Sequence, residues 1–380
     1  MKKYLFFLAA AAALVACSKN EVIPAVNDAE TEITYTVAPK VKSGELEFGT
    51  NLNFNSTAFY LANGLWATEK ANSSVYFQDL LIDHTTGARR NSARKYYWPK
   101  TGSLSFFAWT AVNDAVSSTD GTSTYTPATI TSNGTSAFAE TVTNTEGVKF
   151  TNYDVASNKN VDLLVANEKV DQHSNNAADK IFTEGVATIF KHKLSKVLFT
   201  VVTDKEYADN GVTFKVNSIT FKSIDNMGDY YQYNTTDAEE EWKNQGNAAD
   251  VIYYSDATTG FEVPVTTAKT IWADGNNYIY MPQTFTEDAG AAATPSDCFV
   301  VDYTITIKNA AGTATISTEN VKQTISLNSA TAGNVIFPAW EMGKKYTINL
   351  KFTLDEILWD PAVEDWELKN SGDVTVNPTV

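Results

Sequence analysis

The stretch Val301-Asp302-Tyr303-Thr304-Ile305-Thr306-Ile307-Lys308 alternates strictly between apolar and polar residues. A second run, between residues 346 and 354, does the same, with its apolar positions at Tyr346, Ile348, Leu350, Phe352 and Leu354. This period of two is typical of a β-strand that buries one face and exposes the other to water. Both runs therefore predict half-buried strands of antiparallel sheets.

The same pattern extends outward from these runs, with one interruption. Phe214 and Val216 share one parity, whereas Ile219 and Phe221 take the other, which predicts a β-bulge near Asn217. Turn-forming pairs separate the strand-like runs: Ser43-Gly44, Asn63-Gly64, Asp120-Gly121, Asn133-Gly134, Asp274-Gly275 and Gly333-Asn334. Many short strands between regular turns predict an all-β sandwich.

The length of the chain predicts two domains. Its 380 residues exceed what one hydrophobic core usually organises, and a 43% hydrophobic content is enough for two cores. The polar stretch 171–179 lies between two strand-like runs, so we place the boundary just after it, with domains at 17–184 and 185–380. The stretch 111–145 is rich in Ser, Thr and Asn and predicts a long loop or a weak edge hairpin. A net charge of -16 argues against a nucleic acid partner.

The N-terminus predicts export. Lys2 and Lys3 precede an apolar run, residues 5–16, which is too short for a permanent membrane span. The ending Leu-Val-Ala-Cys resembles the bacterial lipoprotein signal, so residues 1–16 are predicted to be removed and Cys17 to be acylated. That would leave Cys298 without an internal disulfide partner, and we interpret it as a small buried apolar residue.

The search for catalytic residues finds little. His84, His173 and His192 lie far apart, and none has a second residue at metal-ligand spacing. Neither a nucleophile motif nor a phosphate-binding glycine loop occurs. The sequence therefore predicts a protein that is not an enzyme and that takes no cofactor and no metal.

The chain resembles the fimbrillin superfamily of type V pilins from Bacteroidales. The resemblance rests on the lipoprotein start and on short motifs in order: Tyr97-Trp98-Pro99 with residues 104–108, Phe190 to Val197, Tyr280 to Thr284, Gly343 to Ile348, and Val363 to Trp366. It implies two tandem transthyretin-like antiparallel β-sandwich domains. It also implies a lipoprotein of the outer membrane and cell surface that joins other pilin subunits head to tail in a fimbrium and supports adhesion.

The resemblance further implies that a trypsin-like protease removes the first strand. Ile33, Tyr35 and Val37 alternate and form a candidate for that strand. Pilins of this family have an arginine at the processing site, but the first arginine here is Arg89, so the candidate cleavage sites are Lys40 and Lys42. Without cleavage the subunit would keep its lipid and act as an anchor or accessory protein.

In such pilins a neighbour's C-terminal strand fills the vacated groove, because an extended segment pairs the exposed backbone edges. The tail of this chain offers a candidate donor strand with apolar residues at Val374, Val376 and Val380. The same tail can equally be the last strand of its own domain.

Two hypotheses of different classes remain. The first is a structural subunit or accessory protein of a fimbrium, with a possible host or bacterial surface ligand. The second is a surface glycan-binding lipoprotein, in which exposed aromatic rings stack on sugars. They differ in the exposure of four tryptophans, Trp98, Trp109, Trp242 and Trp272. Burial favours the first hypothesis, and a coplanar exposed set favours the second.

Overall fold

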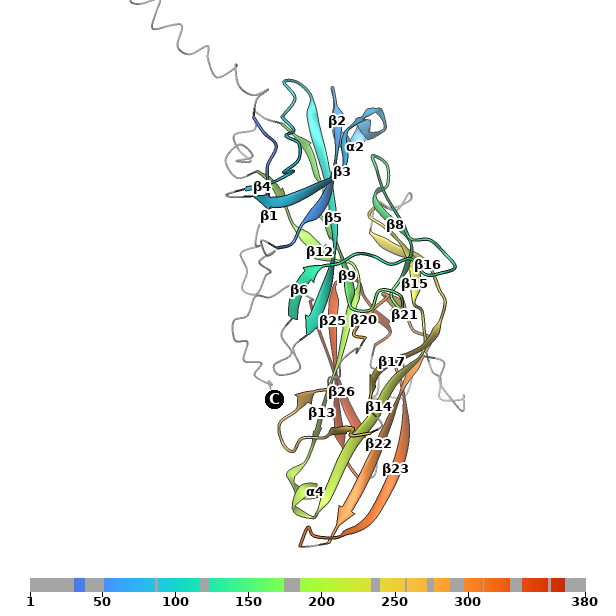
Figure 1. Ribbon diagram of the computed structural model, residues 1–380. Coiled ribbons are helices and arrows are strands. Elements are labelled where there is room, and N and C mark those ends of the chain that lie inside the picture. Colours follow the sequence, from blue (N-terminus) through green and yellow to red (C-terminus); the bar gives the residue numbers. More distant parts are fainter. Residues whose placement is uncertain are drawn as a thin grey trace, which may run out of the picture. The chain divides into compact units, whose positions relative to one another are not determined.

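The computed structural model describes residues 31–37, 51–85, 88–116, 123–173, 185–233, 240–256, 258–271, 277–287, 297–309, 311–328, 337–354 and 357–365. These residues form many strands in several sheets and very little helix, which confirms the all-β class (Figure 1). They divide into two compact units, each described below by itself. Unit 1 holds the described parts of residues 1–38, 54–108 and 167–189, and unit 2 holds those of the remainder. The domain boundary predicted after residue 184 adjoins residues 174–184, which lie outside the described residues, and it stays a prediction.

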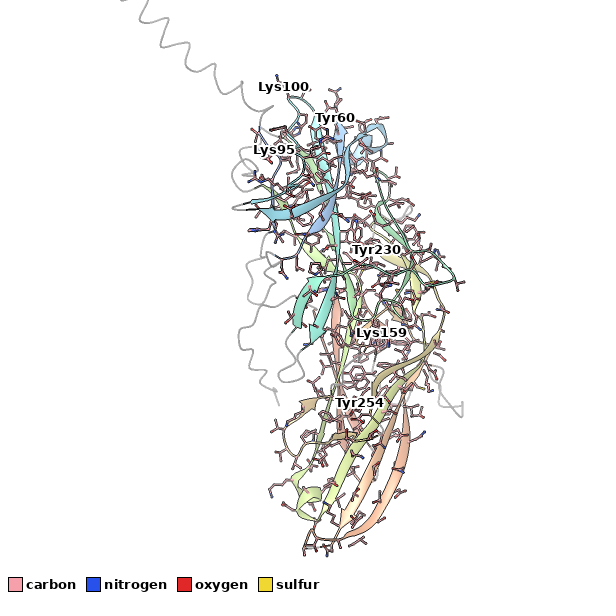
Figure 2. All side chains as sticks on the ribbon, in the orientation of Figure 1. Tyr60, Lys95, Lys100, Lys159, Tyr230 and Tyr254 are labelled. Carbon is pink, nitrogen blue, oxygen red and sulfur yellow. The ribbon has the colours of Figure 1, made fainter. Side chains whose placement is uncertain are left out.

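Unit 1 is built around one sheet. Its strands are β1 (Tyr35–Val37), β2 (Phe54–Leu61), β3 (Ser74–Thr85), β4 (Ala88–Arg90), the first part of β5 (Ser103–Val116), β10 (Lys169–Gln172) and β11 (Val186–Thr188). The strand order is β11-β1-β4-β3-β2-β5, and β10 pairs with β5. Two short helices, α2 (Trp66–Glu69) and η3 (Lys70–Asn72), connect β2 to β3. Figure 2 labels Lys95 and Lys100, which are both exposed, on this unit.

Aromatic rings fill the core of unit 1. Phe106 packs edge-on against Trp98 and Tyr35, with ring centroids 5.6 Å and 6.0 Å away. Phe107, the next residue on β5, packs against Phe59 and Trp66. Residues 104–108 of β5 are thus buried on both faces, as expected where an apolar run is continuous rather than alternating.

Unit 2 contains the end of β5 and most of the other strands. These are β6 (Ser123–Pro127), β7 (Ala139–Thr143), β8 (Gly147–Asp154), β9 (Val161–Ala166), β12 (Phe190–His192), β13 (Ser195–Thr203), β14 (Val212–Ile224), β15 (Met227–Tyr231), β16 (Glu241–Gly246), β17 (Ala249–Ser255), β18 (Phe261–Glu262), β19 (Lys269–Thr270), β20 (Ile279–Tyr280), β21 (Gln283–Thr284), β22 (Cys298–Lys308), β23 (Thr315–Ser326), β24 (Ala339–Trp340), β25 (Lys344–Phe352) and β26 (Ile357–Asp365). A short helix, α4 (Lys205–Asp209), joins β13 to β14.

Two sheets of unit 2 pack face to face. One has the order β19-β13-β25-β26 and the other β17-β14-β22-β23. Phe199 of the first sheet contacts Phe221, Tyr253 and Phe299 of the second, with ring centroids 4.7–5.5 Å apart. Phe352 of the first sheet likewise packs on Phe214 and Tyr303 of the second. This layer of rings between two sheets is the core of a β-sandwich.

The alternating runs form the strands that their pattern predicts. β22 and β25 bury most of their apolar positions and leave the residues between them partly exposed, but Ile307 is only half-buried. The prediction for Leu354 is wrong, because β25 ends at Phe352 and Leu354 is 46% exposed beyond it. The register between β14 and β22 shifts between Val216 and Ser218, which confirms the bulge at Asn217. Cys298 is fully buried, as predicted.

One further feature differs from the sequence-based expectations, and a second decides between two of them. Most pairings are antiparallel, but β1–β11 and β13–β25 run parallel, because strands so far apart in the chain are not tied by a hairpin that would fix their direction. In the stretch 111–145, the end of β5 pairs antiparallel with β6, which agrees with the edge-hairpin alternative rather than with a long loop, and β7 follows. The tandem transthyretin-like arrangement stays a prediction.

Replacement of Phe221 by alanine tests the sandwich core. Phe221 is fully buried and contacts the rings of Phe199, Tyr280, Phe299 and Trp340. We expect Phe221→Ala to lower the free energy of unfolding by about 3–5 kcal/mol in chemical denaturation, because truncation leaves a cavity. Ile316→Ala, at a side chain that is 69% exposed, is the matched control and should change it by less than about 0.5 kcal/mol. Equal effects of the two substitutions would contradict the packing described.

Candidate functional site: the seat of the first strand

Residues 31–37 form hydrogen bonds to neighbouring segments on two sides. On one side, Ile33 N donates to Tyr96 O at 2.8 Å and Trp98 N donates to Thr31 O at 3.0 Å. On the other side, Val186 N donates to Thr34 O at 2.8 Å, and β1 continues as a parallel pair with β11. We call residues 31–37 and the side chains around them the first-strand seat. Its central segment is an inserted strand, not an edge.

The side chains of the first strand anchor it in unit 1. Ile33 and Tyr35 are each 4% exposed, whereas Val37 is half-buried. The Tyr35 ring packs edge-on against Phe54 at 5.5 Å and against Phe106 at 6.0 Å. Burial of this kind stabilises by roughly 1.5–3 kcal/mol for each large apolar side chain, relative to leaving it in water. Removing the strand would therefore expose an apolar groove.

A buried hydrogen bond joins the first strand to β2. The Tyr35 hydroxyl and the Ser56 hydroxyl lie 2.9 Å apart, and both residues are buried. Burial raises the pKa of the Tyr35 phenol far above its usual range, and the Ser56 contact offsets only part of that effect. The phenol is therefore held neutral and pointed at one partner.

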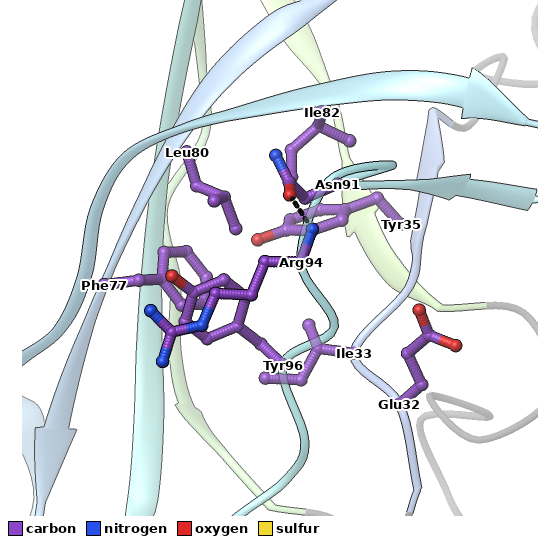
Figure 3. A pocket seen from close by; sticks show the side chains of 9 residues that line it. All are labelled: Glu32, Ile33, Tyr35, Phe77, Leu80, Ile82, Asn91, Arg94 and Tyr96. Atoms are coloured by element: carbon purple, nitrogen blue, oxygen red, sulfur yellow. Dashed lines mark hydrogen bonds between the residues drawn. The ribbon is translucent and has the colours of Figure 1, made fainter.

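A small pocket opens beside the strand. Figure 3 shows its lining, which combines the apolar side chains of Ile33, Phe77, Leu80 and Ile82 with the polar ones of Glu32, Asn91 and Arg94. Arg94 N donates to Asn91 Oδ1 at 2.6 Å, and the Arg94 guanidinium lies 5.0 Å from the centre of the Tyr96 ring. These contacts shape the segment 91–96, which pairs with the first strand.

Charges fix the start of the strand. Glu32 lies 3.0 Å from Arg90 and 3.5 Å from Lys95, measured between the carboxylate and the nearest cationic nitrogen. The side chains of Arg90 and Lys95 are 30% and 62% exposed, so these pairs contribute at most about 1 kcal/mol each. Because each contribution is small, we expect these ion pairs to affect the register of the first strand more than the strength with which unit 1 holds it. No local pattern predicts these pairs, because Glu32 and Arg90 are far apart in the chain.

The structure brings together only part of the predicted site. The alternation at Ile33, Tyr35 and Val37 is confirmed as strand β1 and the residues before it. The remaining predicted site residues lie outside the described residues: Cys17, Lys40, Lys42, Val374, Val376 and Val380. Their roles stay predictions. Among the described residues, no helix is long and apolar enough to cross a membrane.

The burial of the described tryptophans argues against a sugar-binding platform of exposed aromatic rings. Trp98 is 2% exposed. Trp109 is half-buried against Phe150, and Trp242, also half-buried, donates its indole N–H to Lys193 O at 2.6 Å. Trp272 lies outside the described residues. Trp98 is therefore a core residue, and none of the three described members is exposed, which favours the first hypothesis.

The histidines do not gather as ligands. His192 is buried beside Asp162, and within the described ranges no three His, Cys, Asp or Glu side chains are grouped to hold a metal ion. His192 is only 4% exposed, because a carboxylate partner lets the ring be buried.

Comparisons with known proteins identify the class to which this fold and seat belong. The sequence profile described as fimbrillin-like matches residues 61–366. The chain therefore belongs to the fimbrillin-like family, whose members are structural and adhesion proteins rather than enzymes. No curated protein matches the chain.

One solved structure supports the fold, and two others are less similar. A fimbrial protein from Bacteroides vulgatus is similar with a TM-score of 0.54 at 16% identity, over 88% of this chain and 99% of that one. A putative cell adhesion protein from Bacteroides uniformis is similar with a TM-score of 0.43 at 14% identity, over 88% and 99%. The tip fimbrial protein Mfa3 from Porphyromonas gingivalis gives 0.36 at 9% identity, over 88% and 100%. The last two similarities are too low to add to the argument.

Replacement of Tyr35 by phenylalanine tests the seat. We expect Tyr35→Phe to lower the free energy of unfolding by about 0.5–1.5 kcal/mol, because the buried Ser56 hydroxyl loses its partner. Peptides that cover residues 31–37 should also exchange their amide hydrogens faster. Tyr97→Phe, at a ring that is 38% exposed, is the control and should do neither. Unchanged exchange in Tyr35→Phe would show that the hydroxyl does not hold the strand.

Proposed function

We propose that this protein is a structural subunit or accessory protein of a cell-surface fimbrium, assembled by exchange of its first strand and supporting adhesion. Membership of the fimbrillin-like family supports the class. The observation that carries the assembly step is the first-strand seat, in which a short segment is paired on both sides and buries two side chains.

Strand exchange follows from the backbone pairing of the seat. Withdrawal of residues 31–37 would leave groups such as Val186 N and Tyr96 O without their present partners. An unsatisfied buried polar group costs about 1–3 kcal/mol, and the apolar groove adds to that cost. An extended segment from a second copy would restore both the pairing and the burial. Repeated head to tail, this contact does not close on itself and produces a filament.

In this proposal, the protease that releases the first strand cleaves after a lysine. Lys40 and Lys42 follow β1 in the sequence and provide trypsin-like cleavage sites. Arg89, the first arginine, is only 6% exposed and pairs through its backbone with Tyr35, so a protease cannot readily reach it. Cleavage after either lysine would release the lipid-bearing segment that begins at Cys17. An uncut chain would instead stay in the outer membrane as an anchor.

The C-terminal tail has a sequence suited to the seat. Asp373-Val374-Thr375-Val376 repeats the order of Glu32-Ile33-Thr34-Tyr35: an acid, an apolar residue, threonine and a second apolar residue. Laid in the same direction, Asp373 would meet Arg90 and Lys95, and the two valines would take the buried positions. Val376 is smaller than Tyr35 and has no hydroxyl, so it fills the seat less completely.

Limited trypsin digestion tests the cleavage and the assembly. We expect the purified mature protein to be cut at Lys40 or Lys42, as read by intact mass, and then to form ladders or filaments in size-exclusion chromatography. The double variant Lys40→Ala/Lys42→Ala should stay uncut and monomeric. A clean cut that yields only a stable monomer would exclude polymerisation by strand exchange.

The match between tail and seat gives a second test. If Val376 occupies the Tyr35 position, Val376→Tyr should make the assembled form more resistant to heat and detergent, because the ring restores packing against Phe54 and Phe106. Dissociation can be followed by gel mobility at rising temperature. Val380→Tyr, outside the four-residue match, is the control. Equal gains in both variants would contradict the proposed register.

A further inference from the structure

A lysine and an aspartate meet in the interior of unit 2. The Lys196 Nζ lies 2.5 Å from Asp114 Oδ2, and the two side chains are 4% and 0% exposed. Lys196 stands on β13 and Asp114 on β5. Neither residue takes part in the fimbrial function proposed above, so that function does not explain why these two charged side chains are buried.

The surroundings of the pair are fixed and mostly dry. Lys196 Nζ also donates to Ser123 Oγ at 2.8 Å and lies 5.3 Å from the centre of the Tyr278 ring. The Tyr278 hydroxyl donates to the backbone carbonyl of Asp114. The carboxylate's other oxygen, Asp114 Oδ1, has no hydrogen-bond partner among the described residues.

The backbone holds both side chains in place. The residue before Asp114 is registered with Val161 of β9, and Lys196 is registered with Ile279 of β20 and with Lys345 of β25. Since each strand is paired along its length, the amine and the carboxyl cannot easily separate. Two groups held in contact react as if at a very high effective concentration.

Burial also favours the reactive form of the amine. The pKa of Lys196 is lowered, chiefly because burial disfavours the ammonium, although the Asp114 charge opposes this. A neutral amine carries the free electron pair that a nucleophile needs. A permanent ion pair in this place would have to offset the desolvation of both charges.

We propose that Lys196 and Asp114 condense to an intramolecular amide, a covalent cross-link between β13 and β5. A proton passes from the ammonium to the carboxylate, and the free electron pair of Nζ attacks Cγ of Asp114. A C–N bond forms and one C–O bond breaks. The departing oxygen carries away two protons from the nitrogen, so one water molecule leaves and no oxidant, reductant or other reactant is needed.

A second carboxyl accompanies the pair. Asp162 is fully buried next to His192, and its pKa is raised, chiefly by burial, while the charge of Asp114 adds to the shift and those of His192 and Lys196 oppose it. Asp162 Oδ1 has no hydrogen-bond partner among the described residues. The negative charge of Asp162 would raise the pKa of Lys196, so Asp162 favours the reaction only in its neutral, protonated form, which its own burial promotes.

The cross-link would join residues that are 82 positions apart in the sequence. Tension applied between β5 and β13 would then be carried by a covalent bond instead of by hydrogen bonds and packing. Chains in a filament are loaded end to end, so such a bond is useful in a subunit of the kind proposed. The cross-link does not depend on that function, because its chemistry lies within one chain.

Peptide mapping of the denatured full-length protein tests the proposal. Trypsin cleaves after a free lysine but not after an acylated one. We therefore expect residues 194–205 to remain uncut at Lys196 and to be joined to residues 101–149, with a total mass one water below the sum. Recovery of a separate peptide 194–196 and of an unmodified peptide 101–149 would overturn the proposal and leave an ordinary ion pair.

A matched variant shows whether the loss of water occurs at Lys196 or at another site in the chain. Lys196→Arg keeps the positive charge and the pairing with Asp114, but a guanidinium does not condense with a carboxyl group under these conditions. Its intact mass should show no loss of water relative to its sequence, whereas the wild type should be one water lighter than its own. A water loss that persists in Lys196→Arg would assign it to another site and would also overturn the proposal. Neither result bears on strand exchange.

Discussion

The pairing of residues 31–37 with two neighbours at once is the constraint on which unit 1 depends. A strand in the middle of a sheet satisfies backbone groups on both sides, so its removal opens two edges together. The side chains of Ile33 and Tyr35 add a buried apolar layer on top of that pairing. Because the segment is short, the energy that holds it is modest compared with that of a full-length strand. A segment of this kind suits the strand exchange proposed above, since another of similar pattern could restore the same pairing.

Unit 2 distributes its stability differently. Its two facing sheets are joined by a continuous layer of rings, in which Phe199 and Phe221 contact partners from several strands. No single short segment carries that layer, because its rings come from several strands of both sheets. The buried charges also lie here, at Lys196 and Asp162 among others, where pairing offsets the cost of desolvation.

The local pattern of the sequence predicts the strands well and their partners poorly. Alternation at 301–308 and 346–354 and the change of parity around Asn217 are properties of a few neighbouring residues. The structure has them as predicted, except at Ile307, which is half-buried, and at Leu354, which is exposed beyond β25. The parallel pairing of β13 with β25 depends on the path of the intervening chain, which no local pattern encodes. The ion pairs of Glu32 and the burial of Lys196 depend on the same long-range pairings. A lysine in an alternating run looks solvent-exposed until its partner is known.

The two sites use charge in opposite ways, and this difference follows from burial. Glu32 is 16% exposed, but its partners Arg90 and Lys95 are 30% and 62% exposed, so water screens the attraction and exchange of one acidic segment for another costs little. Asp114 meets Lys196 where water is excluded, so separation of the two would leave an uncompensated charge that costs several kcal/mol, about 3–5 by comparison with other buried pairs. An exposed pair therefore suits a contact that must be replaced during assembly, whereas a buried pair suits one that must persist under load.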